Sequence, residues 1–139
     1  MSWELRGGSW EAGVGSRELM EKPHKKLDVW KESINFVSLI YQLVRCFPKN
    51  EEYGLISQIK RASVSIPGNI AEGAARQTRR EYIQFLYIAR GSISEVDTYL
   101  EIAKNLSFIS DESINPIEQK MVNVDKMLTG LIYSLKKSK

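Results

Sequence analysis

The sequence contains one cysteine, Cys46, and one histidine, His24. A single cysteine excludes a disulfide within the chain and a cluster of thiolate ligands around a metal ion. Cys46 stands in an apolar stretch, so we expect a small buried side chain rather than a nucleophile. His24 lies among lysines before the first predicted helix, so a Ser-His-Asp or Cys-His site would require it to fold back onto the bundle. The chain therefore has little of the chemistry that catalysis requires.

Other absences narrow the class of protein further. No apolar run approaches the ~20 residues that a helix needs to cross a bilayer. The first residues lack the basic segment and apolar core of a secretory signal. The sequence also lacks the Glu-x-x-His pair of di-iron bundles and the glycine-rich loops that hold nucleotides. We expect a cytoplasmic protein that is not an enzyme, holds no metal or other cofactor and does not enter a membrane.

The net charge of +3 arises in the centre of the chain. Residues 1–54 and 96–139 each contain equal numbers of acidic and basic residues, whereas residues 55–95 contain six basic residues and three acidic ones. The six are Lys60, Arg61, Arg76, Arg79, Arg80 and Arg90. Because arginine presents a planar fork that suits phosphate and carboxylate alike, the central segment is the place to search for an anion-binding surface.

Residues 1–25 are expected to form a flexible N-terminal extension, and residues 26–139 a single helical domain. Residues 1–19 hold four of the nine glycines and show no periodic apolar pattern. The stretch that begins at Met20 is more typical of the start of a domain. Translation from a start codon upstream of Met20 would explain the residues before it. In the alternative interpretation, Trp3 and Trp10 anchor this extension on a partner.

The first predicted helix runs from about Asp28 to Arg45. Asp28 is expected to cap its start, and Pro48 to end it. Two neighbouring apolar stripes run along this helix. Together they form an apolar face that is wider than a helix needs for the core of one bundle. We therefore expect this helix to contact another subunit as well. The residues assigned to that contact are Trp30, Phe36, Ile40 and Phe47.

The second predicted helix spans about residues 52–73 and contains Pro67. Proline inside a helix removes a backbone hydrogen bond and clashes with the preceding turn, which destabilises the helix by ~3 kcal/mol. We therefore expect the helix to be kinked or broken near Pro67. The third helix opens with Thr78 and Glu81 at the spacing of a capping box. Its apolar stripe contains Gly91, which predicts close approach of a neighbouring helix.

The fourth predicted helix begins near Pro116, or alternatively at Asp111, and ends in lysines that suit the negative end of a helix. Four amphipathic helices with short connections predict an all-α fold, an antiparallel up-down-up-down four-helix bundle. No segment alternates apolar and polar residues convincingly, so no strand-based fold is expected.

Two polar groups are candidates for a site. The first is a ladder at helical spacing in the second helix: Gln58, Arg61, Ser65, Asn69 and Glu72. It would form either a binding surface or a buried network that satisfies the backbone groups freed by Pro67. Arg61 is expected to pair with Glu72 or with Glu95.

The second candidate is the basic turn from Arg76 to Arg80. Arg76, Arg79 and Arg80 stand at the predicted start of the third helix, where free N–H groups already favour anions. With Lys60, they are the residues expected to contact the phosphates of a nucleic acid. The alternative is a solvated charged turn with no ligand.

The run from Phe47 to Gly73, F-P-x-x-E-x-Y-G-L-x-x-Q-I-x-R-A-x-V-S-I-P-x-N-I-A-E-G, resembles the 23S rRNA intervening sequence protein family. The continuation from Arg80 to Ser92, R-E-Y-x-x-F-L-x-I-A-x-G-S, is similar to the same family, and the resemblance covers about residues 26–136. It implies a left-handed bundle and a homo-oligomeric ring, with the pentamer as the expected form. A related group, the accessory proteins of diversity-generating retroelements, binds nucleic acid and a reverse transcriptase.

The resemblance and the central arginines together favour a homo-oligomer that binds nucleic acid, with structured RNA as the expected partner. Five copies at +3 each would carry about +15, and phosphate binding scales with the number of contacts. The alternative is a protein-interaction scaffold or adaptor whose arginines form ion pairs between subunits.

Overall fold

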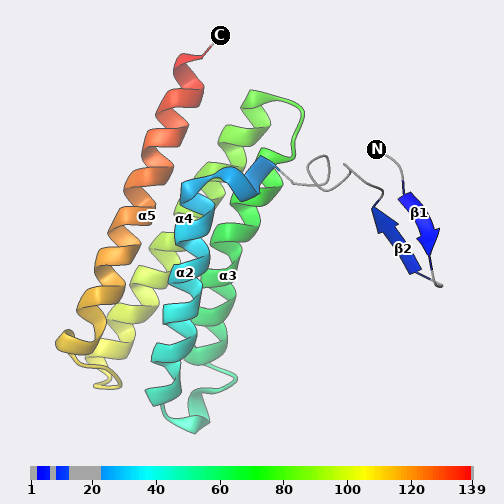
Figure 1. The fold of residues 1–139 in the computed structure, drawn as a ribbon. Helices are drawn as coiled ribbons and strands as arrows, with labels where there is room; N and C mark the ends of the chain where they lie inside the picture. Colours follow the sequence, from blue (N-terminus) through cyan, green and yellow to red (C-terminus); the bar gives the residue numbers. More distant parts are fainter. Residues whose placement is uncertain (1–2, 7–8, 13–22, 139) are drawn as a thin grey trace.

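Four long helices form the body of the protein in a computed structural model that describes residues 3–6, 9–12 and 23–138. They are α2 (Asp28–Leu43), α3 (Leu55–Ala74), α4 (Arg79–Asn105) and α5 (Asp111–Lys137). Each packs on the next along the chain, and α5 closes the bundle against α2. Figure 1 shows that consecutive helices run in opposite directions. The predicted packing of four helices is confirmed.

Shorter elements lie before and between these helices. Three short helices, η1 (Pro23–Lys26), η2 (Val44–Cys46) and η3 (Lys49–Glu51), flank α2 and lead into α3. Strands β1 (Trp3–Arg6) and β2 (Ser9–Ala12) pair antiparallel in the segment that was expected to lack regular structure. A strand of four residues is too short for its alternation of apolar and polar side chains to be distinctive, so the sequence pattern did not predict β1 and β2. Met20 lies outside the described residues.

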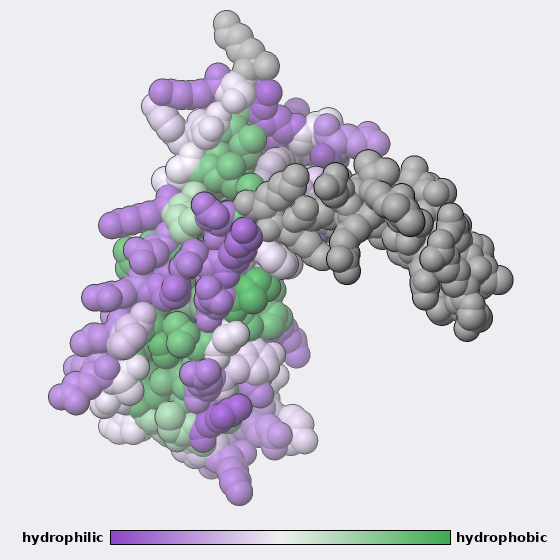
Figure 2. Space-filling view, viewed as in Figure 1, coloured by the Kyte–Doolittle hydropathy of each residue, from purple (hydrophilic) through white to green (hydrophobic). Residues whose placement is uncertain are grey.

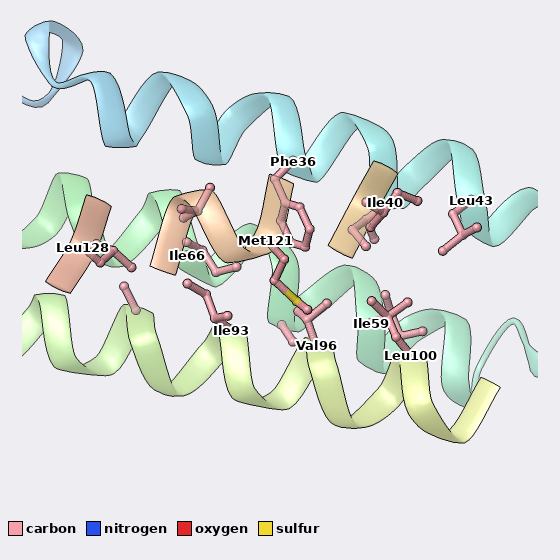
Figure 3. Close-up of a cluster of buried hydrophobic side chains, with 14 of the residues drawn as sticks. Phe36, Ile40, Leu43, Ile59, Ile66, Ile93, Val96, Leu100, Met121 and Leu128 are labelled. Carbon is pink, nitrogen blue, oxygen red and sulfur yellow. The ribbon is translucent and has the colours of Figure 1, made fainter. Parts of the chain in front are cut away.

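The core is a single apolar cluster to which all four helices contribute (Figure 3). Its fully buried large side chains include Phe36 and Ile40 from α2, Ile59, Ile66 and Ile70 from α3, Leu86 and Leu100 from α4, and Ile114 and Leu128 from α5. On the surface, apolar patches lie between hydrophilic side chains on the face shown in Figure 2. Among the described residues, no helix combines the length and the apolar character needed to cross a bilayer.

The second apolar stripe of α2 lies inside the protomer's own core. Phe36 and Ile40 are 0% exposed and Phe47 is 5% exposed, so the prediction that these three side chains contact another subunit is corrected. A helix at the corner of a bundle packs against two neighbours, here α3 and α5, and needs an apolar face wide enough for both. Trp30 is partly buried against the same core.

Helix α3 continues through Pro67 without a break, and no kink is shown. The predicted break is therefore wrong. Pro67 is itself buried, so its ring adds to the apolar packing that holds the turn in place. Side chains also bond to backbone carbonyls on the preceding turns: Ser65 Oγ donates to Ala62 O at 2.7 Å, and Asn69 Nδ2 donates to Ser65 O at 2.7 Å.

Helix α2 starts at Asp28, as predicted, but Asp28 does not cap it, and α5 starts before Pro116, the first predicted start. The residue before α2 is Leu27, which makes no side-chain capping bond, and Asp28 lies inside the first turn. There its carboxylate suits the positive end of the helix dipole without capping it. Helix α5 starts at Asp111, the alternative start, because Ser110 forms the capping box. Pro116 is consequently inside the helix.

The glycine at which two helices approach closely is Gly73 rather than Gly91. A Cβ atom on Gly91 would meet no atom within 4 Å, so the close approach predicted there is wrong. A Cβ atom on Gly73 would lie 2.8 Å from Phe85 Cβ and 3.2 Å from Tyr82 O. Both are parts of α4 that cannot rotate away, so glycine at this position lets α3 pack tightly on α4.

Replacing Gly73 with alanine is expected to destabilise the protein by about 1–2 kcal/mol, because the clash with α4 outweighs the gain in helix propensity. Gly91→Ala is the matched control, since it adds the same methyl group to a helix in open space. It should stabilise the protein by up to about 1 kcal/mol. Urea denaturation of the two variants measures both effects. Equal shifts in the same direction would contradict the packing assigned to Gly73.

Candidate nucleic-acid interface

The basic turn connects α3 to α4 at one end of the bundle. Thr78 caps α4: its Oγ1 accepts a hydrogen bond from Glu81 N at 3.1 Å and donates one to the Glu81 carboxylate at 3.0 Å. The Thr78 half of the predicted capping box is confirmed, whereas the Glu81 carboxylate accepts from the Thr78 hydroxyl instead of the Thr78 backbone N–H. This cap fixes the residues that follow on the first turn of α4. Arg79 and Arg80 are those residues, and both are exposed.

The three arginines of the turn have different surroundings. Arg76 pairs with Glu72 at 2.8 Å and lies over the Phe85 ring, 4.8 Å from its centroid. Arg79 donates a hydrogen bond to Ser138 O at the end of α5. Arg80 is exposed and lines a hollow at the same end of the bundle. All three are exposed to solvent, and Arg76 is paired with Glu72.

This hollow lies between the start of α4 and the end of α5 and has a volume of about 420 Å³. Its wall combines two arginines and one lysine with neutral side chains: Arg79, Arg80, Ile83, Gln84, Leu135, Lys136 and Ser138. The three cations come from segments far apart in the sequence. We call this group, Arg79, Arg80 and Lys136, the basic end.

The sequence prediction missed Lys136, which was interpreted only as a partner for the helix dipole. Its Nζ donates to the Tyr87 hydroxyl and lies 5.0 Å from the centre of that ring. Lys137 lies over the Tyr133 ring in the same way, at 4.5 Å. The predicted antiparallel topology could have identified Lys136, because it places the end of the fourth helix of the bundle beside the start of the third.

Lys60, which was predicted to contact phosphates with these arginines, lies apart from the basic turn. It lies about 21 Å along α3 from Ala74, the last residue of the helix, at ~1.5 Å per residue, in the half of the helix farther from the basic turn. Its ammonium lies 4.8 Å from the centre of the Tyr41 ring, on α2. The predicted phosphate-binding set is thus divided between the two ends of the bundle.

The polar ladder of α3 is partly structural. Ser65 Oγ lies 2.5 Å from Ser92 Oγ and ties α3 to α4. Asn69 bonds within α3, to the carbonyl of Ser65. These bonds support the packing, although they reach the Ala62 and Ser65 carbonyls rather than Ser63 O, the carbonyl that Pro67 leaves without its usual donor.

The remaining residues of the ladder face solvent. Gln58 and Arg61 are exposed, and Arg61 makes no ion pair among the described contacts. Its expected partner Glu72 pairs with Arg76 instead, one turn further along the chain. The side chain of Glu95 is exposed as well. The pairing predicted for Arg61 is therefore wrong within one protomer.

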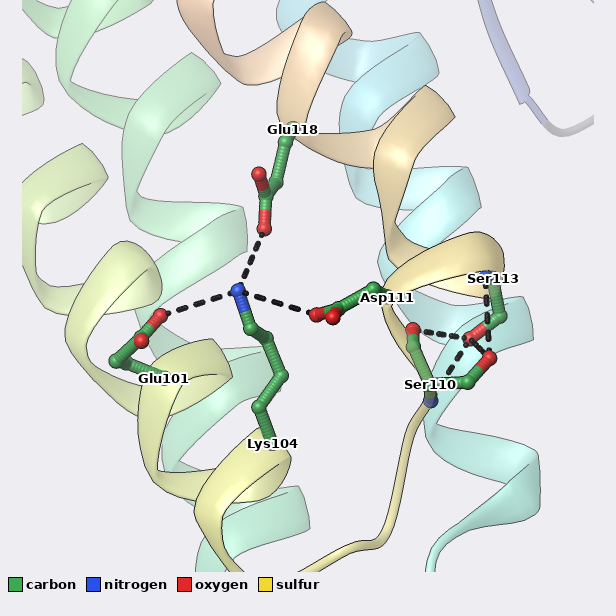
Figure 4. Close-up of polar contacts among 6 residues, drawn as sticks. All are labelled: Glu101, Lys104, Ser110, Asp111, Ser113 and Glu118. Carbon is green, nitrogen blue, oxygen red and sulfur yellow. Dashed lines mark hydrogen bonds and ion pairs between the residues drawn. The ribbon is translucent and has the colours of Figure 1, made fainter.

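A dense cluster of charges at the other end of the bundle holds α4 against α5 (Figure 4). Lys104 Nζ lies 3.3 Å from Glu118, 3.4 Å from Glu101 and 3.7 Å from Asp111. The hydrogen bond to Glu118 is the main reason why the pKa of Lys104 is raised above its ordinary value. Because its charge is already surrounded by carboxylates, Lys104 stabilises the turn rather than offering a site for an anion.

The remaining candidates for chemistry lie apart from one another. Cys46 is the last residue of η2 and is exposed, contrary to prediction; its thiol donates to Leu43 O at 2.9 Å. His24 packs edge-on against Trp30, with ring centres 4.9 Å apart. Within the described part of the chain, no group of three or more histidine, cysteine, aspartate or glutamate side chains is arranged to hold a metal ion.

Comparison with known proteins identifies a family, and a crystal structure is among the solved structures that are similar to this chain. The profile of the family described as 23S rRNA-intervening sequence protein matches residues 25–130. A crystal structure of a protein with unknown function, from the S23 ribosomal protein family of Bacteroides thetaiotaomicron, is 28% identical with a TM-score of 0.69. The match covers 75% of this chain and 97% of that one. No curated protein matches.

Proposed function

The chain belongs to the 23S rRNA-intervening sequence protein family, and from this premise we propose that it is a non-catalytic homo-oligomer that binds structured RNA. The binding surface is the basic end, together with Arg76 on the adjoining turn. Its cellular location in this proposal is the cytoplasm, where structured RNA is abundant.

The observation that carries the proposal is the gathering of Arg79, Arg80 and Lys136 around one hollow. A phosphodiester backbone binds where several cations converge on an exposed surface, and arginine adds two-pronged hydrogen bonds to the charge. The free N–H groups at the start of α4 favour an anion at the same position. The wall of the hollow also contains Gln84, whose amide suits ribose or base edges.

Assembly would multiply this surface. Five protomers at +3 would carry about +15, and each would add its own basic end to the contacts with phosphate. Exposed apolar side chains on α3 and α4 support self-association: Val64 is 42% exposed and Ile88 is 51% exposed. In the sequence, Val64 adjoins Ser65 and Ile88 stands four residues before Ser92, and Ser65 and Ser92 form the contact that joins these two helices. We propose a pentameric ring, in which Trp30 remains a candidate contact.

The second candidate function is a protein-interaction scaffold. Arg61 and Glu95 are both exposed, and neither makes an ion pair among the contacts of the described residues. An arginine and a glutamate left unpaired beside exposed apolar side chains are suited to ion pairs between subunits or with a protein partner. In this case the ring itself, rather than its charge, would be the functional feature.

A titration of purified protein with a structured RNA hairpin, at low and at moderate salt, separates the two functions. We expect binding that weakens steeply with salt, because counterions are released from the phosphates. Light scattering of the same samples should give a molar mass of several times 15.9 kDa, the mass of one chain. An oligomer that does not bind RNA even at low salt would contradict the RNA proposal and favour the scaffold.

A further inference from the structure

A second hollow, of about 450 Å³, lies at the corner where α2 passes into α3. Tyr41 and Arg45 contribute to its wall from one side, one helical turn apart along the chain. Ile56 and Lys60 contribute from α3 with the same spacing. The connection between the helices closes the end of the hollow with Lys49. We call this space the corner pocket.

The charge around the corner pocket is mainly positive. Arg45, Lys49 and Lys60 line it together with one acid, Glu52. None of the three cations forms an ion pair among the described contacts. The ammonium of Lys60 is held 4.8 Å from the centre of the Tyr41 ring, a contact that positions the charge without neutralising it. Three cations on three segments can therefore converge on one anion.

The walls of the corner pocket are also apolar and aromatic. Val44 and Phe47, 3% and 5% exposed, form buried parts of the wall, and Ile56 is partly buried beside them. Tyr41 is 40% exposed, so part of its ring is open to a ligand. A small inorganic anion would leave this apolar surface uncovered. A ligand that carries both a phosphate and a flat heterocycle would use the cations and the apolar wall together.

We propose that the corner pocket binds a nucleotide. Arg45, Lys49 and Lys60 hold its phosphate, and its ribose and base lie against Tyr41 and Ile56. The same chemical unit occurs as a free nucleoside monophosphate and within a single strand of RNA. The site is separate from the basic end and lies at the opposite end of α3, so it stands independently of the RNA function proposed there.

Isothermal titration of the full chain with adenosine monophosphate tests the corner pocket, with adenosine and inorganic phosphate as separate probes. We expect the monophosphate to bind more tightly than either part alone. The double variant Arg45→Ala/Lys60→Ala should weaken this binding by about tenfold or more, since two charge-assisted contacts are removed. Lys31→Ala/Lys126→Ala, which removes the same charge from exposed parts of α2 and α5, should leave it unchanged.

Three results would overturn the proposal: no binding of the monophosphate, equal binding to both double variants, or inorganic phosphate binding as tightly as the nucleotide. Circular dichroism of the variants establishes that they remain folded. A five-nucleotide single-stranded RNA, added as a competitor, identifies the source of the ligand. If it displaces the monophosphate, the pocket accepts a unit within a strand; if it does not, the ligand is the free nucleotide. Failure of hairpin binding at the basic end would leave these results unaffected.

Discussion

Replacing Phe36 with alanine is expected to lower the free energy of unfolding by about 3–5 kcal/mol, the cost of removing a large aromatic side chain from a packed core. The Phe36 side chain is 0% exposed, and Figure 3 shows it directed from α2 into the apolar cluster near Met121. A loss of this size is a large part of the stability of an ordinary single domain. The variant should therefore unfold at a markedly lower urea concentration.

Urea denaturation followed by circular dichroism measures this effect, at a fixed protein concentration because self-association would also contribute to stability. Tyr53→Ala is the control, since Tyr53 is 94% exposed and its removal leaves no cavity. A Phe36→Ala variant as stable as the control, but with a lower molar mass in light scattering, would restore the original assignment of Phe36 to a subunit contact.

Removing two cations from the basic end is expected to have the largest effect on RNA binding. The double variant Arg79→Ala/Arg80→Ala should weaken binding of a structured RNA hairpin by about 10- to 100-fold, because each residue offers a charge-assisted contact to phosphate. The slope of log K against log salt should become shallower by about 1.4–1.8, from ~0.7–0.9 per phosphate contact. Filter binding at several salt concentrations gives both quantities.

Lys31→Ala/Lys126→Ala is the matched control for this prediction as well. It lowers the net charge from +3 to +1, as the test variant does, but at exposed positions on α2 and α5. If both variants weaken RNA binding equally, the total charge of the protein governs the interaction, and the assignment to the basic end fails. Arg76 is left in place because its contacts with Glu72 and Phe85 also support the turn.

The sequence was sufficient for the helices and for most of the core. The stripe of α4 from Leu86 to Ala103 is buried at its predicted positions. The cap by Thr78 could also be predicted, because a capping bond depends on residues three positions apart. Signals of this kind can be predicted because all the residues that they involve lie within one or two helical turns of one another.

The failures concern contacts between segments. Phe36 was assigned to another subunit because the sequence shows how wide an apolar stripe is, but not how many neighbours inside the protomer cover it. Gly91 was assigned the close approach that belongs to Gly73, because a glycine in a helix does not show which side faces another helix. Pro67 was expected to kink or break α3, because the energetic cost of a proline inside a helix was considered without the packing around its buried ring.

By itself, the sequence determined four amphipathic helices, their approximate limits and the excess of arginine near the middle of the chain. These properties follow from periodicity, caps and composition, which act locally. Only the tertiary structure decided which cations lie together. It separated Lys60 from the arginines by more than half the length of α3, and it brought Lys136 beside Arg79 and Arg80. The physical reason is that a site depends on distances through space, and the packing of the helices sets those distances between residues far apart in the chain.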